Sequence, residues 1–116
     1  MNEKELDKFI FKVNLPYPQA VVLNYIYGRK YLPKAKVIEI FKLLTTVEMN
    51  PYYFTFVLGE DYIEYFCSKL DELLAATLGF DPVKENIVRK VCMFFLLTSQ
   101  MKKTAEKEIL EYLEAK

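Results

Sequence analysis

Residues 60–100 read EDYIEYFCSKLDELLAATLGFDPVKENIVRKVCMFFLLTSQ, and this stretch decides the fold. Its first half carries apolar side chains at helical spacing over five turns. They are Ile63, Phe66, Cys67, Leu70, Leu73, Leu74 and Leu78, opposite Glu64, Ser68, Asp71 and Glu72. Gly79 ends this pattern, and Asp81-Pro82 then offers an N-cap and a first helical residue. The stretch therefore predicts helices over 60–78 and 82–100, around which the rest of the chain packs.

Residues that start and end helices recur on both sides of this stretch. Prolines open the apolar segments at positions 18, 33, 51 and 82, and glycines close them at 28, 59 and 79. Proline loses nothing at a first helical position, and glycine accepts the positive φ that ends a helix. The predicted helices are 2–14, 18–27, 33–47, 51–58, 60–78, 82–100 and 104–115, the last capped by Thr104. We therefore expect an all-α protein, one domain over 1–116, built as an irregular bundle of six to seven helices.

One segment permits a different interpretation. Residues 52–58 read YYFTFVL, which is rich in strand-forming side chains. Gly59 and Glu60 could turn such a strand back on residues 62–67, giving an α+β fold with one hairpin over 52–67. A short buried helix is favoured, because Asn50 and Pro51 supply its cap and first residue.

Acidic and basic residues are equal in number, sixteen each, but they are not mixed along the chain. Residues 8–38 contain no acid and have a net charge of +6, whereas residues 39–81 have a net charge of −6. Electrostatic fields act locally, so this separation indicates one surface suited to anions and another suited to cations.

The basic surface centres on residues 27–36, which join two predicted helices. Its candidate anion-binding or nucleic-acid-binding residues are Tyr27, Arg29, Lys30, Tyr31, Lys34 and Lys36. Lysine and arginine beside a helix N-terminus favour phosphate, and tyrosine can stack on unpaired bases. A plain solvated loop or a protein-docking loop fits the same residues, because short basic loops are common.

The acidic surface lies on the predicted helix 60–78. Its members are Glu60, Asp61, Glu64, Asp71 and Glu72. A solvated acidic face or a docking face for a basic partner explains them better than a metal site does. Carboxylate-bridged iron sites use histidine as well, and the chain has none.

Nothing in the sequence predicts catalysis. The phosphate-binding and dinucleotide-binding glycine motifs are absent, as is Cys-x-x-Cys. Cys67 and Cys92 each lie in the middle of an apolar segment, so we expect core packing for both. The chain is therefore expected to be no enzyme and to need neither a metal nor another cofactor.

Residues 20–27 and 91–97 are apolar at nearly every position, and residues 51–58 are strongly aromatic. A bundle of this size cannot easily surround three such segments, so we expect a homo-oligomer or a protein partner to cover one of them. The longest apolar run is seven residues, and the N-terminus is charged, so a cytoplasmic protein without a membrane span is expected. Lysine far outnumbers arginine, which fits a thermophile or an AT-rich genome.

These observations favour a non-enzymatic helical binding protein, an accessory subunit or adaptor that acts through aromatic and charged faces. A nucleic-acid-processing complex is its expected setting. The alternative is direct binding of DNA or RNA through residues 27–36.

Overall fold

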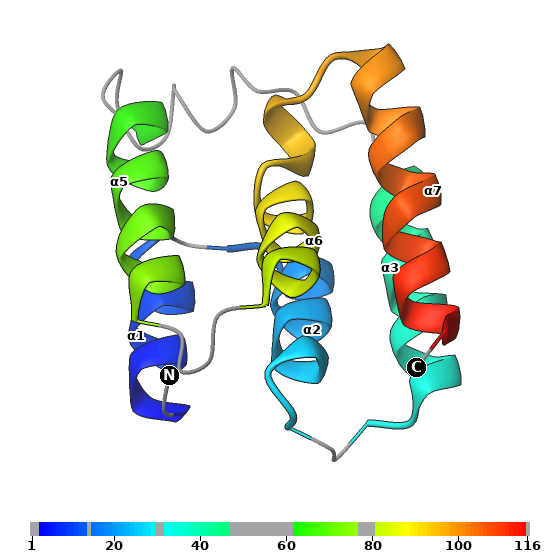
Figure 1. The fold of residues 1–116 in the computed structure, drawn as a ribbon, viewed down its shortest axis with the longest axis horizontal. Coiled ribbons are helices and arrows are strands. Elements are labelled where there is room, and N and C mark those ends of the chain that lie inside the picture. Colours follow the sequence, from blue (N-terminus) through cyan, green and yellow to red (C-terminus); the bar gives the residue numbers. More distant parts are fainter. Residues whose placement is uncertain (1–2, 14, 30–31, 47–61, 77–80, 116) are drawn as a thin grey trace.

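The computed structural model describes residues 3–13, 15–29, 32–46, 62–76 and 81–115. Within these ranges the chain forms six α-helices and one short 3₁₀ helix, with no strand (Figure 1). They are α1 (Glu3–Lys12), α2 (Tyr17–Ile26), α3 (Lys34–Thr46), α5 (Tyr62–Ala75), α6 (Pro82–Cys92), η1 (Phe94–Leu96) and α7 (Ser99–Ala115). The predicted all-α class is confirmed. The predicted helix 51–58 lies outside the described residues, and the alternative hairpin fails because its second strand is part of α5.

The helices pack as three pairs, each joining one helix from the first half of the chain to one from the second. The pairs are α1 with α5, α2 with α6, and α3 with α7 (Figure 1). The α2–α6 pair is central, since α2 also contacts α3 while α6 contacts both α5 and α7. The radius of gyration is 13.5 Å, close to the roughly 13.4 Å typical of a compact domain of this length. The α1–α5 pair consequently stands at one edge of the array.

Apolar side chains at helical spacing form the core. Leu6, Phe9 and Val13 of α1 are buried, and the buried positions of α3 repeat at the same spacing. One cluster of buried side chains includes members from every described α-helix. Helix formation therefore follows from each amphipathic face having a neighbour to bury it.

The nearly uniform apolarity of residues 20–27 has an internal explanation. This segment lies in the central α2, where Val22 and Leu23 are fully buried. Gln19, at the start of the helix, is also fully buried. Its Nε2 atom donates hydrogen bonds to the backbone carbonyls of Val91, at 2.8 Å, and Cys92, at 3.3 Å. A side chain that the sequence did not single out thus joins α2 to the end of α6.

The prediction of one helix over 82–100 is wrong. Helix α6 ends at Cys92, η1 follows, and Leu97 is extended before α7 begins at Ser99. A straight helix would expose part of an apolar run that covers all its faces. The break instead turns Phe94 into the core, where its ring meets the edge of Phe41 at 6.1 Å between centroids.

The N-terminal end of α7 is therefore also corrected. The Thr98 hydroxyl accepts a 3.4 Å hydrogen bond from the Met101 N–H, as a residue preceding a helix does. Thr104, the predicted cap, lies inside α7, and its hydroxyl donates to the Gln100 carbonyl. Val91, Cys92 and Phe94 of the apolar run are buried within the chain, so these positions no longer argue for a partner. The predicted oligomer stays a prediction.

The cap predicted before α6 is confirmed. One Asp81 carboxylate oxygen accepts hydrogen bonds from the backbone N–H groups of Val83, at 3.0 Å, and Lys84, at 3.2 Å. Asp81 itself has extended backbone angles, as expected for an N-cap. Its carboxylate therefore fixes where α6 begins.

Candidate functional site

The basic segment begins with a glycine turn at the end of α2. Gly28 has a φ of 84°, and its N–H donates to the Tyr25 carbonyl. The Arg29 N–H donates to the Asn24 carbonyl at 2.9 Å, which completes a Schellman motif. The turn directs Arg29 toward α1, where its Nη1 atom lies 2.9 Å from the Asp7 carboxylate. Only 10% of the Arg29 side chain is exposed, so this cation holds two helices together.

The other described members of the basic segment also have neighbours within the chain. The Lys34 Nζ atom donates to the Glu114 carbonyl at 3.0 Å, near the end of α7. Lys36 lies 3.6 Å from Glu39, one turn along α3, and the Tyr27 ring lies beneath the Lys84 ammonium group. Lys30 and Tyr31 lie outside the described residues. Among the described members, the half-exposed Lys36 is the side chain best placed to reach a phosphate.

The acidic residues of α5 remain on the surface. Glu64, Asp71 and Glu72 are all exposed, while Glu60 and Asp61 lie outside the described residues. Asp71 lies 3.6 Å from Arg89 of α6, and Glu72 lies 3.2 Å from Lys69. Exposed pairs of this kind contribute little to stability. Within the described ranges, no three acidic or cysteine side chains come together in a group able to hold a metal ion.

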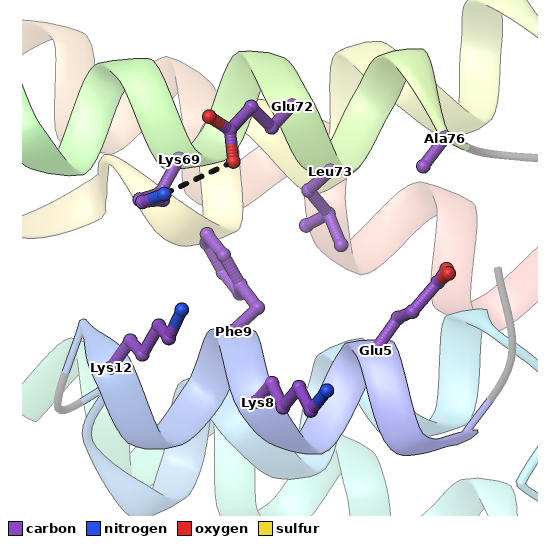
Figure 2. A pocket seen from close by; sticks show the side chains of 8 residues that line it. All are labelled: Glu5, Lys8, Phe9, Lys12, Lys69, Glu72, Leu73 and Ala76. Atoms are coloured by element: carbon purple, nitrogen blue, oxygen red, sulfur yellow. Dashed lines mark hydrogen bonds and ion pairs between the residues drawn. The ribbon is translucent and has the colours of Figure 1, made fainter.

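A groove between α1 and α5 brings together residues that the sequence analysis did not connect (Figure 2). It has a volume of about 220 Å³. Its lining residues are Glu5, Lys8, Phe9 and Lys12 from α1, with Lys69, Glu72, Leu73 and Ala76 from α5 and its end. Figure 2 shows the Phe9 ring between the two helices, with charged side chains around it.

The floor of the groove belongs to the core. Phe9 is 7% exposed and Leu73 is 4% exposed, and the Phe9 ring packs against Phe66 with centroids 6.4 Å apart. These contacts fix the distance between α1 and α5. The aliphatic stems of the surrounding lysines add apolar surface to the walls, because lysine exposes its charge while covering apolar neighbours with its stem.

The rim of the groove carries three ammonium groups and two carboxylates. Lys69 is paired with Glu72 at 3.2 Å and also lies over the Tyr65 ring. Lys8 and Lys12 are both exposed and stand one turn apart on α1. Neither has an ion-pair partner in the part of the chain that the structure describes. The α1 wall therefore presents two available cations above an apolar floor.

The sequence held one signal for this groove. Lys4, Lys8 and Lys12 repeat every four residues, which aligns them on one face of a helix. That face borders the buried stripe of Leu6 and Phe9. Sequence periodicity does not reveal which helix packs opposite, so the pairing with α5 was not predictable.

A second hollow lies between the end of α6 and α7, with a volume of about 280 Å³. Its walls are Lys90, Leu97, Gln100, Met101, Thr104 and Ala105. Lys90 supplies its charge and is already paired with Glu108. The lining of this hollow therefore offers a ligand no available cation, whereas the lining of the α1–α5 groove offers Lys8 and Lys12.

The cysteines differ in their surroundings. Cys92 is buried, and burial raises the pKa of its thiol far above the ordinary value, while the nearby Arg89 offsets only part of the rise. The core prediction holds for Cys92, whereas Cys67 is only half-buried. A neutral buried thiol is a poor nucleophile.

Comparison with protein-family models, with curated proteins and with solved structures gives no match for this chain. None of the described helices combines the length and apolarity needed to cross a membrane.

Proposed function

We propose that this protein is a non-enzymatic binding module, an accessory subunit or adaptor, and that a partner protein docks in the α1–α5 groove. The observation that carries the proposal is the groove itself, an apolar floor bounded by available cations at the edge of the helix array. Interfaces combine an apolar centre with a polar rim in this way.

Exposed aromatic side chains support the same function. Phe11 of α1 is 86% exposed and Tyr17 of α2 is 69% exposed. Aromatic residues are enriched in protein interfaces because they bring a large contact area at little cost in side-chain entropy. Both lie near the connection from α1 to α2, so they extend the surface that a partner of α1 can contact.

A photo-crosslinking pair tests the proposal. A photoreactive phenylalanine replaces Glu72, which stands on the rim of the groove, or Glu64, which is exposed on the same helix but outside the lining. Irradiation in cells of the source organism should give nuclease-resistant protein adducts from position 72 and few from position 64. Equal adducts from both positions would contradict docking in the groove.

Direct binding of DNA or RNA through residues 27–36 is the alternative. Lys36 favours it, since its side chain is 52% exposed and its distance from Glu39 is long. The contacts of Arg29 and Lys34 within the chain leave fewer cations for phosphate. If this function is correct, labelled oligonucleotides will bind at low salt, and Lys36→Ala will reduce the slope of log affinity against log salt by about one.

The setting in a nucleic-acid-processing complex and the homo-oligomer are predictions from the sequence. Light scattering tests the oligomer directly, since a monomer has a mass of 13.7 kDa. A particle of that mass at high micromolar concentration would exclude stable self-association.

A further inference from the structure

The size of the α1–α5 groove limits what can occupy it. A cavity of about 150 Å³ holds benzene, whereas pockets for cofactors and drug-sized molecules occupy roughly 300–1,000 Å³. At about 220 Å³ the groove has room for one large apolar side chain. A peptide anchored by a single leucine or aromatic residue fits this volume better than a small-molecule cofactor.

The charges of the groove specify what should flank that anchor. Three lysines face two glutamates, so the lining has a net charge of +1. Because Lys69 is paired with Glu72, the cations available to a ligand are Lys8 and Lys12 on α1. They are four residues apart and therefore about 6 Å apart along the helix axis. Carboxylates at a similar spacing on a partner would complement them.

Nucleic acid fits this site less well. Glu5 and Glu72 stand in the same lining, and a nucleic acid carries a phosphate at every nucleotide, whereas a peptide can carry carboxylates only where Lys8 and Lys12 lie. The apolar floor of Phe9 and Leu73 offers phosphate nothing to bind. A peptide can present an apolar side chain to the floor and carboxylates to the α1 wall at the same time.

We infer, on the basis of the proposed function, that the groove binds an acidic amphipathic peptide segment of another protein. One large apolar side chain of this segment lies in the groove, against its floor of Phe9 and Leu73. Carboxylates beside it pair with Lys8 and Lys12. The segment is helical, since a helix places an anchor and its acidic neighbours on one face at spacings of three or four residues.

The test uses a display library of random 12-residue peptides, selected on the wild-type protein. Enriched peptides should share a large apolar residue with Asp or Glu three or four positions away. Their affinity should fall about tenfold or more in the double variant Lys8→Glu/Lys12→Glu, since two attractive contacts become repulsive. The matched control is Lys103→Glu/Lys107→Glu, which reverses two exposed lysines at the same spacing on α7 and should change affinity less than twofold.

A second pair of variants tests whether binding needs the open volume of the groove, without changing the charge of the protein. Ala76→Trp should fill the groove and reduce peptide affinity at least tenfold, while Ala75→Trp should have less than a twofold effect. Circular dichroism confirms that all variants are folded. The site would be established if the charge-reversal variant on α1 and Ala76→Trp both lose peptide binding while both control variants keep it.

Other outcomes overturn the inference in distinguishable ways. Enriched peptides without acidic residues, or equal losses in the α7 control, would exclude an acidic partner while leaving position-specific crosslinking, and hence the proposed function, intact. If Ala76→Trp abolishes self-association in sedimentation, the occupant is a second copy of this chain. If labelled oligonucleotides lose binding in the α1 double variant and no peptide is enriched, the groove binds nucleic acid. Failure of both peptide selection and crosslinking removes the proposed function as well.

Discussion

Replacing Gln19 by methionine tests the most consequential contact in the fold. The two side chains have similar length and volume, so Gln19→Met opens no large cavity. It does remove the Nε2 donor that binds the Val91 and Cys92 carbonyls at 2.8 and 3.3 Å. These carbonyls belong to the last residues of α6, where the helix breaks and the chain turns toward α7.

The expected cost follows from the burial of this site. Each buried hydrogen bond contributes about 1 kcal/mol net, and leaving its partner unsatisfied costs more. The Gln19 Oε1 atom has no hydrogen-bond partner among the described residues, so its removal offsets part of the loss. We expect the free energy of unfolding to fall by about 2 kcal/mol. For a chain of 116 residues this corresponds to a decrease in Tm of roughly 8 °C.

Urea denaturation followed by circular dichroism measures this effect. The midpoint should fall by about 1 M with an unchanged m value. Gln100→Met is the matched control, because Gln100 is exposed on α7, and its midpoint should barely move. A Gln19→Met protein within 0.5 kcal/mol of the wild type would refute the reasoning, since the amide would then contribute nothing at the end of α6.

Three further outcomes are expected. Asp81→Ala should destabilise the protein by about 1 kcal/mol, because it removes the N-cap of α6. The control Asp71→Ala, at an exposed ion pair, should change thermal stability little. Similar effects of the two substitutions on thermal stability would argue against the cap. Because burial raises the pKa of the Cys92 thiol, this thiol stays protonated at neutral and moderately alkaline pH. A thiol reagent should therefore label Cys92 in the native protein at least tenfold more slowly than the half-buried Cys67. Comparable labelling rates would show that Cys92 is accessible. Gly28→Ala should lower the free energy of unfolding, measured by chemical denaturation, by about 1 kcal/mol, because Gly28 has a φ of 84°. A Cβ at this position would meet no atom within 4 Å, so only backbone strain should contribute. A much larger loss would contradict this reasoning.

The sequence alone determined the all-α class and the residues at which several of the helices begin or end. Helical spacing of apolar residues predicted which faces are buried, as in α5 with Phe66, Leu70 and Leu73. Asp81 and Gly28 could be identified as a cap and a terminator because these roles depend on backbone chemistry within a few residues. Such local interactions are complete within one turn, so the sequence contains all that is needed to predict them.

The tertiary structure alone decided where the apolar run 91–97 stops being helical and where charges find partners. No glycine or proline marks the break after Cys92; it coincides with hydrogen bonds from Gln19, more than seventy residues away. Arg29 was predicted to be a candidate anion-binding residue, but a neighbouring helix places Asp7 beside it. The groove exists because α1 packs on α5, a pairing that unites residues more than fifty positions apart. Periodicity reports which face of a helix is buried and not which helix buries it, and for this reason the candidate site could not be read from the sequence.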